Sequence, residues 1–229
     1  MHPPVIAVDG PAGSGKSSVC RGVAERLGLR YLDTGAMYRA MTWAMLADGV
    51  DVDDPAAVAA HADGARIVSG TDPRNPTIHV GSTDVSGPIR GDAVTGAVSA
   101  VSAVPEVRDR LVTLQREEVA SAEREGHGIV VEGRDITTVV LPDADLKIFI
   151  TADPAVRAAR RAAQDVGLGK DGVDVTLTET ALRERDAKDS SRVASPLAQA
   201  ADAIVVDTTA LTLDEVIDHV CDLARSRTP

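Results

Sequence analysis

One run of eight residues near the amino end constrains the fold of this chain more than any other feature: Gly10-Pro11-Ala12-Gly13-Ser14-Gly15-Lys16-Ser17. It matches the phosphate-binding loop pattern G-x-x-x-x-G-K-[ST] in full, directly after the apolar run Val5–Val8 and before a helical stretch. Glycines let the backbone turn tightly around an anion, and N–H groups at the start of the helix point toward it. Lys16 adds a positive charge, and the Ser17 hydroxyl suits Mg²⁺. A glycine-rich turn with a chance lysine is the alternative, but the full match in this context predicts a nucleoside triphosphate site.

The remaining sequence alternates between short apolar runs and helical patterns, which predicts an α/β fold with a parallel sheet wrapped by helices. Strands are expected at 5–9, 31–33, 129–132, 146–151 and 203–206. Helices are expected at 16–27, 35–48, 55–63, 92–104, 105–125, from 154 onward, 178–191 and 213–225. Residues 65–88 instead hold glycines and prolines between short β-favouring pieces, so they predict a small antiparallel insertion.

At 229 residues, the length suits a single domain over 1–229. We expect its core at about 1–50, 89–152 and 195–229, the insertion at about 65–88, and a hinged lid at about 153–194. Two cysteines, Cys20 and Cys221, fall in predicted helices, and we expect buried free thiols, as in a reducing cytoplasm.

The net charge of the chain limits the classes of partner that it can bind. The formal net charge of −11 argues against a general nucleic-acid binder, and no apolar run approaches the roughly 18 residues that a membrane span needs. An acidic chain can hold a polyanionic nucleotide only by concentrating arginines locally. The positions of the arginines should therefore mark the site.

Arginines and carboxylates follow two predicted strands, where α/β sheets bind ligands. Asp33, Thr34 and Arg39 follow one strand end, and Glu132, Arg134 and Asp135 follow another. Carboxylates there suit a metal shell and arginines suit phosphates. Taken alone, the same residues also fit a helix cap, a surface arginine and a surface ion pair.

Further arginines lie on the predicted helices of the lid. Arg157, Arg160 and Arg161 crowd one helix side, where like charges without an anion repel by a few tenths of a kcal/mol. Arg185, Asp189 and Arg192 share a face of the next helix, although an Arg–Asp pair within that helix is a rival interpretation. Arginines on a mobile segment that closes over phosphates and excludes water suit phosphoryl transfer between two nucleotides. No histidine or cysteine spacing indicates a zinc site.

In this order, a series of motifs resembles the bacterial-type cytidylate (CMP) kinases of the P-loop nucleoside monophosphate kinase superfamily: VDGPAGSGKSS, LDTGAMYR, DVSGPIR, VSAVPEVR, EGRDITTVV with PDA and KIFI, RAARR, and RERDAKDSSRVASP. The resemblance runs from Val5 to about Arg225. It implies a P-loop kinase fold and transfer of the γ-phosphoryl group of ATP to CMP or dCMP with Mg²⁺. From the thiols, the net charge and the lack of a long apolar run, we expect a cytoplasmic protein with no nucleic-acid or membrane partner. We expect a monomer, because closing motions need free lid and insertion surfaces.

The resemblance assigns roles residue by residue. ATP would contact Gly10, Pro11, Ala12, Gly13, Ser14, Gly15, Lys16, Ser17 and Ser18. The monophosphate would contact Thr34, Tyr38, Arg39, Ser99, Arg108, Arg134, Asp135, Arg185, Asp189 and Arg192. Catalysis would fall to Lys16, Arg134, Arg157, Arg161 and Arg185, and Mg²⁺ to Ser17 with Asp33 and Glu132 through water.

Three of these positions match the family's base-reading set: Ser99, Arg108 and Asp135. Spacing alone marks Ser99 and Arg108 as surface residues, so the resemblance reverses that interpretation. A carboxylate accepts from the cytosine N4 amino group, whereas uracil carries a carbonyl oxygen there. Two positions depart from the family pattern, since Glu132 stands where some relatives carry Asp and Lys188 where some carry Arg.

Two rival functions stay open at this stage. One is a P-loop kinase for another small acceptor, such as shikimate, gluconate or dephospho-coenzyme A, and it leaves the insertion and the base-reading set unexplained. The other is an ATP-binding sensor without catalysis, which has no need of lid arginines. A GTPase is disfavoured because the chain contains no Asn-Lys-x-Asp motif.

Overall fold

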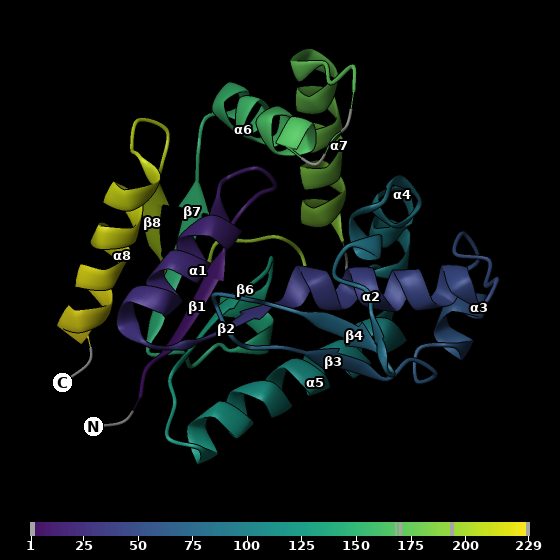
Figure 1. Cartoon of the computed structure of the whole chain (residues 1–229), viewed down its shortest axis with the longest axis horizontal. Helices are drawn as coiled ribbons and strands as arrows, with labels where there is room; N and C mark the ends of the chain where they lie inside the picture. Colours follow the sequence, from purple (N-terminus) through teal and green to yellow (C-terminus); the bar gives the residue numbers. More distant parts are fainter. Residues whose placement is uncertain (1–2, 168, 170, 193–194, 228–229) are drawn as a thin grey trace.

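The computed structural model describes residues 3–167, 169, 171–192 and 195–227, and its centre is a parallel sheet (Figure 1). Five strands lie in the order β2-β6-β1-β7-β8, all parallel. They are β1 (Val5–Asp9), β2 (Arg30–Asp33), β6 (Ile129–Glu132), β7 (Leu146–Thr151) and β8 (Ile204–Asp207). This arrangement confirms the expected fold, and each strand end falls within one residue of its expected place.

Helices connect and cover these strands. They are α1 (Lys16–Leu27), α2 (Thr34–Ala47), α3 (Pro55–Ala60), α4 (Asp92–Val101), α5 (Pro105–Arg124), α6 (Pro154–Gly167), α7 (Val175–Ser191) and α8 (Leu213–Arg227). In Figure 1, α1 and α8 lie together on one side of the sheet, and α5 lies on the other. The sheet is therefore the middle layer of three.

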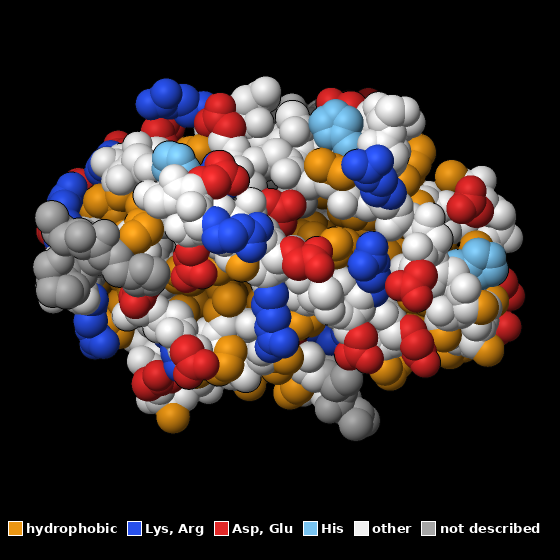
Figure 2. All heavy atoms as spheres, turned by 90° about the horizontal axis from the view of Figure 1, so that it is seen from below, with side chains coloured by type: hydrophobic (Ala, Val, Ile, Leu, Met, Phe, Trp, Pro, Cys, Tyr) orange, Lys and Arg blue, Asp and Glu red, His pale blue; other side chains and the backbone are white. Residues whose placement is uncertain are grey.

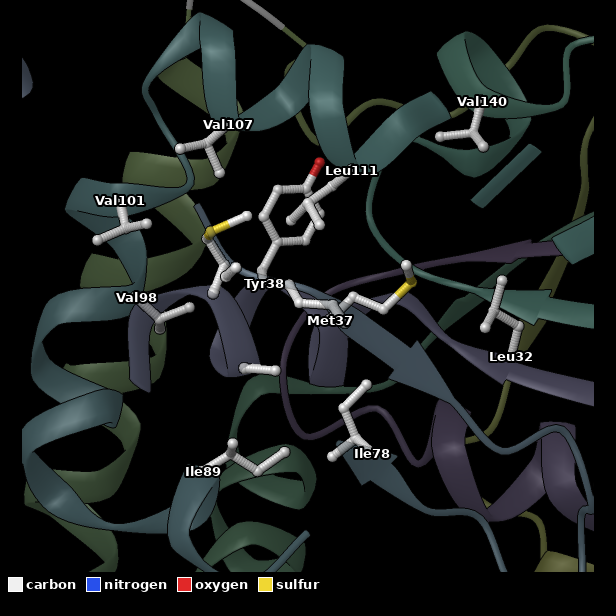
Figure 3. Close-up of a cluster of buried hydrophobic side chains, with 14 of the residues drawn as sticks. Leu32, Met37, Tyr38, Ile78, Ile89, Val98, Val101, Val107, Leu111 and Val140 are labelled. Carbon is white, nitrogen blue, oxygen red and sulfur yellow. The ribbon is translucent and has the colours of Figure 1, made fainter. Parts of the chain in front are cut away.

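The strands are buried on both faces, so their alternate side chains feed two cores. Ile6 and Val8 of β1 pack with α1 and α8, whereas Val5 and Ala7 pack with α2 and α5. The second core is built mostly from aliphatic side chains around the ring of Tyr38 (Figure 3). The low aromatic content of the chain, 2%, is thus compensated by valine, leucine, isoleucine and methionine.

Local chemistry sets the helix ends. Gly28 takes the left-handed conformation (φ 66°) that ends α1, as its position in the sequence predicts. Three expected boundaries are wrong by about one turn, and one of them is the end of the helix expected at 55–63, which ends at Ala60. The helix expected to run to residue 104 ends at Val101, because the residue before Pro105 is restricted to extended conformations. The helix expected to start at residue 178 starts at Val175, because the Asp174 side chain caps it.

The insertion is a separate three-stranded antiparallel sheet, as expected. Its strands are β3 (Ile67–Ser69), β4 (Ile78–Val80) and β5 (Thr83–Asp84), followed by the short 3₁₀ helix η1 (Pro88–Arg90). Ile67, Ile78 and Ile89 turn into the core that contains α2. This packing fixes the insertion against the helix that follows β2.

Two short elements in the described ranges were not expected from the sequence, η1 and the π-helix η2 (Ile136–Val140), and η2 borders the site. The carboxylate of Asp9 holds it, accepting hydrogen bonds from the backbone N–H groups of Ile136 (2.9 Å) and Thr137 (2.8 Å) and from the Thr137 hydroxyl (2.6 Å). Burial raises the pKa of Asp9 despite these hydrogen bonds. Asp9 therefore fixes the chain just after Asp135.

The surface is mixed in charge. On the face shown in Figure 2, acidic and basic side chains are interspersed rather than gathered by sign. Cys20 and Cys221 are free and buried, as expected. Within the described ranges, no helix has the length and apolar character needed to cross a bilayer.

Candidate active site

A cavity of about 500 Å³ opens at the carboxyl edge of the parallel sheet. The strand register builds its floor, because β2 and β6 pair with Asp33 directly beside Glu132. The P-loop (Gly10–Ser17) forms one wall, and α2, α4, α6 and α7 contribute the others. Of the predicted residues, it is lined by Ala12, Gly13, Ser14, Gly15, Lys16, Ser17, Ser18, Asp33, Thr34, Tyr38, Arg39, Ser99, Arg108, Glu132, Arg134, Asp135, Arg161, Arg185, Asp189 and Arg192.

The P-loop owes its shape to close backbone packing. A Cβ on Gly10 (φ 150°) would lie 2.0 Å from the Ile150 carbonyl oxygen, so β7 leaves room for glycine alone. Within the loop, the Pro11 carbonyl accepts hydrogen bonds from the Ser14 hydroxyl (3.0 Å) and from Lys16 Nζ (2.9 Å). The lysine therefore folds back over the loop, whose centre is left to an anion.

Lys16 is held in an environment that disfavours its charge. Burial first, and then the nearby Arg134, lower its pKa to about 8. A bound phosphate would reverse both effects by supplying an opposite charge in a low-dielectric site. The loop is thus suited to a polyanion.

Three oxygen-bearing side chains meet beside Lys16: Ser17, Asp33 and Glu132. Burial and the Asp33 carboxylate raise the pKa of Glu132 to about 7, and Tyr31 and Ser17 hydroxyls hydrogen-bond to it. No group of three or more His, Cys, Asp or Glu side chains suited to a metal occurs in the described ranges. Two carboxylates and a hydroxyl fit Mg²⁺, which keeps several waters and takes phosphate oxygens as further ligands.

A second corner of the cavity contains a buried ion pair. Arg108 donates from Nη2 to Asp135 and from Nη1 to the Ser102 carbonyl (3.1 Å). Its guanidinium carbon lies 5.2 Å from the ring centre of Tyr38. Figure 3 shows that ring among aliphatic side chains, and burial raises the pKa of Tyr38 to about 12. Ser99 lies on the same cavity wall.

Between these corners, arginines gather with too few anions. Arg39 donates to the Ile89 carbonyl and the Thr95 hydroxyl (3.0 Å each), and burial together with Arg185 and Arg161 lowers its pKa to about 10. Burial and a neighbouring cation likewise lower the pKa of Arg185 to about 10. Such a cluster of buried, mutually repelling cations is a site for an anion.

Asp189 partly neutralises the cluster. It pairs with Arg192 (2.6 Å), with Arg134 (3.3 Å) and, at the 4.0 Å limit, with Arg185. The Arg–Asp pairing within α7 anticipated from the sequence is thus present, and it coexists with a position on the cavity wall. The Thr34 hydroxyl is engaged by the Glu132 carbonyl (2.7 Å).

The arginines of α6 separate into two roles. Arg161 lines the cavity and pairs with Asp165 (3.1 Å), whereas Arg157 does not belong to the cavity wall and turns behind the P-loop, where it donates to the Ala12 carbonyl (3.0 Å). Arg160 lines the cavity on the far side and donates to Thr208 through both terminal nitrogens (2.8 Å each).

The fold also brings to the site several residues that the sequence did not single out. They are Asp9 beneath η2, Asp186 on α7 and, in the cavity wall on the side of Arg160, Thr208, Leu211, Thr212 and Leu213. Their motifs carry no distinctive spacing. For Asp186 one signal existed, since it lies three residues before Asp189 and so shares its helix face.

Solved structures support the fold. An uncharacterised protein from Eubacterium ventriosum has a TM-score of 0.53 at 15% sequence identity, covering 98% of this chain and 99% of that one. The Thermus thermophilus protein TT1252 has a TM-score of 0.52 at 18% identity, covering 100% of both chains. The fold, with a complete phosphate-binding loop facing an arginine cluster, defines a P-loop kinase.

Sequence comparison is more specific. The cytidylate kinase family matches residues 6–226. Cytidylate kinases from Streptomyces avermitilis and Mycobacterium avium are 57% and 54% identical, each covering 97% of this chain and 93% and 96% of the relative. The chain belongs to the cytidylate kinase family.

Proposed function

We propose that this protein transfers the γ-phosphoryl group of ATP to CMP or dCMP, giving ADP and CDP or dCDP. The observation that carries the proposal is a single cavity with two anion-binding walls, the P-loop on one side and the arginine cluster on the other. One wall suits the triphosphate and the other a monophosphate. Membership of the cytidylate kinase family supports the choice of cytosine.

The donor side consists of residues 10–18. Peptide N–H groups of the loop hold the phosphates, and Lys16 adds charge where the transferred group develops it. Ser17, with Asp33 and Glu132 through water, would hold Mg²⁺. When bound, Mg²⁺ neutralises phosphate charge and fixes the geometry of the oxygens.

The acceptor side orients the monophosphate in line with the donor. Arg39, Arg134 and Arg192 hold its phosphate by charge-assisted hydrogen bonds, and Arg185 faces the group in transfer. Asp189 and Arg185 also serve the sugar hydroxyls. Entry of the phosphate relieves the repulsion that Asp186 and Asp189 leave uncompensated, so binding energy is gained beside the reacting groups.

The buried Arg108–Asp135 pair reads the base. Asp135 accepts from the cytosine N4 amino group, and Arg108 and Ser99 donate to its N3 and O2 acceptors. Uracil would put a carbonyl oxygen against the carboxylate, and a buried mismatch of that kind discriminates strongly.

Helices α6 and α7 form the lid over the reaction, within residues 153–194. Arg161 contacts the phosphates from the lid, and closure excludes water, which limits ATP hydrolysis. We place the protein in the cytoplasm, which its free buried thiols support. We place it there as a monomer, because lid closure needs the lid and insertion surfaces to be free.

A coupled assay of ADP release tests the function, with ATP, Mg²⁺ and one acceptor at a time: CMP, dCMP, UMP, AMP or shikimate. We expect CMP and dCMP to stimulate release at least 100-fold over ATP alone, and UMP and AMP far less. Stimulation by shikimate would favour another acceptor kinase. ATP binding without stimulation by any acceptor would favour a sensor.

A further inference from the structure

Asp186 on α7 links three parts of the site that are far apart in the sequence. Its Oδ1 accepts from the backbone N–H of Ala12 in the P-loop (3.1 Å) and from Arg134 Nη1 (3.3 Å). Its Oδ2 accepts from Arg157 on α6. One carboxylate thereby joins the lid helices to the P-loop and to the end of β6.

The geometry separates Asp186 from the groups that would touch nucleotide. Its side chain is 16% exposed and, like Arg157, does not belong to the cavity wall. Two of its partners, Ala12 and Arg134, do line the cavity. Whatever Asp186 contributes to the reaction must therefore pass through them.

Arg134 is held by Asp186 and by two further partners. Its guanidinium is shared between Asp186 and Asp189, with a further hydrogen bond from Nη1 to the Gly10 carbonyl (3.2 Å). Asp189 lies on the cavity wall, where an incoming nucleotide competes for its carboxylate. Asp186 lies off that wall, so a nucleotide in the cavity would not contact its carboxylate directly.

We propose that Asp186 is a positioning residue for phosphoryl transfer, which aims the Arg134 guanidinium across the cavity by fixing it against the P-loop and Arg157. This inference rests on the proposed kinase function and deepens it. Misplacing a catalytic group by about 1 Å can cost on the order of 100-fold in rate, so loss of the anchor should act on turnover.

The test is steady-state kinetics of Asp186→Asn, which keeps the shape and removes the charge. We expect kcat to fall about 10- to 100-fold, while the Kd of CMP, measured by calorimetry, changes less than about 3-fold because the other cluster arginines remain. Glu184→Gln is the matched control: it removes one negative charge from an exposed position of the same helix and should leave kcat unchanged.

A double-mutant cycle identifies the route of the effect. In an Arg134→Ala background, Asp186→Asn should lower kcat by less than about 2-fold, because the group it positions is absent. Equal losses in both backgrounds, or an unchanged kcat in Asp186→Asn alone, would overturn the proposal. Asp186→Glu, which keeps the charge, should retain more activity than Asp186→Asn, and it replaces that variant in the cycle if Asp186→Asn does not fold.

The wild-type protein in the same assay separates this inference from the function on which it rests. Absence of CMP-stimulated ADP release in the wild type would contradict the kinase function itself. Normal wild-type turnover with an unaffected Asp186→Asn variant would contradict only the role of Asp186.

Discussion

The two anion-binding walls of the cavity are built in different ways. The P-loop is one continuous segment, in which Ser14 and Lys16 hydrogen-bond to the Pro11 carbonyl, and distant residues such as Arg157 and Asp186 brace it from outside. The arginine cluster draws Arg39 from α2, Arg134 from the end of β6 and Arg185 from α7. A site made of backbone groups in one segment can be recognised from consecutive residues of the sequence. A site made of side chains from distant segments forms only when the chain has folded.

The energetics differ as well. Peptide N–H groups attract phosphate without any buried charge of their own. The cluster instead holds cations that repel one another, with Asp186 and Asp189 as the partial compensation. Breaking the donor wall should therefore cost activity alone, whereas changes in the acceptor wall should trade activity against stability.

The largest effect is expected from Lys16→Ala. Loss of the one P-loop cation should lower kcat at least 1000-fold, because it acts on charge that develops in transfer. The melting temperature of the nucleotide-free protein should change little, because burial already disfavours the charge of Lys16 and its removal takes away no net stabilisation. A stopped-flow or coupled assay and a thermal scan check both, and a large drop in melting temperature would contradict the comparison of the walls.

The second-largest effect is expected at Asp135, which tests the base-reading part of the acceptor wall. Asp135→Ala should lower kcat/KM for CMP about 100-fold and that for UMP far less, since the one base group that the carboxylate contacts directly is the N4 amino group, which uracil lacks. The alanine leaves Arg108 buried and unpaired, so Asp135→Asn serves as the better-folded second variant. Equal losses with CMP and UMP in both variants would sink the base-reading assignment.

Arg185→Met should show, at a single residue, a loss of activity together with a gain in stability. We expect kcat/KM for CMP to fall about 10- to 100-fold, and the free energy of unfolding of the nucleotide-free protein to rise by about 1 kcal/mol as repulsion in the cluster is relieved. Urea titration measures the second quantity. Arg183→Met, at an exposed position of the same helix, is the control and should alter neither.

The smallest effect is a pH dependence of stability. The folded-state pKa of Glu132 is raised to about 7, above its usual 4.5, so the folded protein binds the proton more tightly than the unfolded chain. This stabilisation is fully present below pH 4.5 and is lost as the pH rises through about 7. Between these values the free energy of unfolding should fall by on the order of 1–3 kcal/mol in EDTA. Urea titrations of Glu132→Gln over the same pH range should show a smaller fall in the free energy of unfolding. A fall equal to that of the wild type would contradict the raised pKa of Glu132.

Much of the fold was predictable because its signals are local. Apolar runs bounded by turn residues gave the five strands, and Gly28 marked the end of α1. The π-helix η2 was not predictable, because Asp9, more than 120 positions away in the chain, holds it by hydrogen bonds. The start of α7 depends on the Asp174 cap, and the end of α4 depends on Pro105. Hydrophobic periodicity alone does not register either signal.

The same distinction between local signals and long-range contacts applies to the site. Motif and resemblance led to many of the residues that line the cavity, including the Arg108–Asp135 pair that spacing alone did not single out, but not to Thr208 or Leu211. They did not lead to Asp186, whose importance lies in contacts across three elements. The resemblance assigned Arg157 to catalysis, and its place behind the P-loop makes that role a prediction still to be tested.

The most direct test of the two-wall account is the affinity of the nucleotide-free protein for CMP against that for cytidine, measured by calorimetry at fixed ionic strength. If the arginine cluster is a pre-formed site for the acceptor phosphate, CMP should bind at least 100-fold more tightly than cytidine, a gap that narrows as salt increases. Equal affinities for the two ligands would contradict the account.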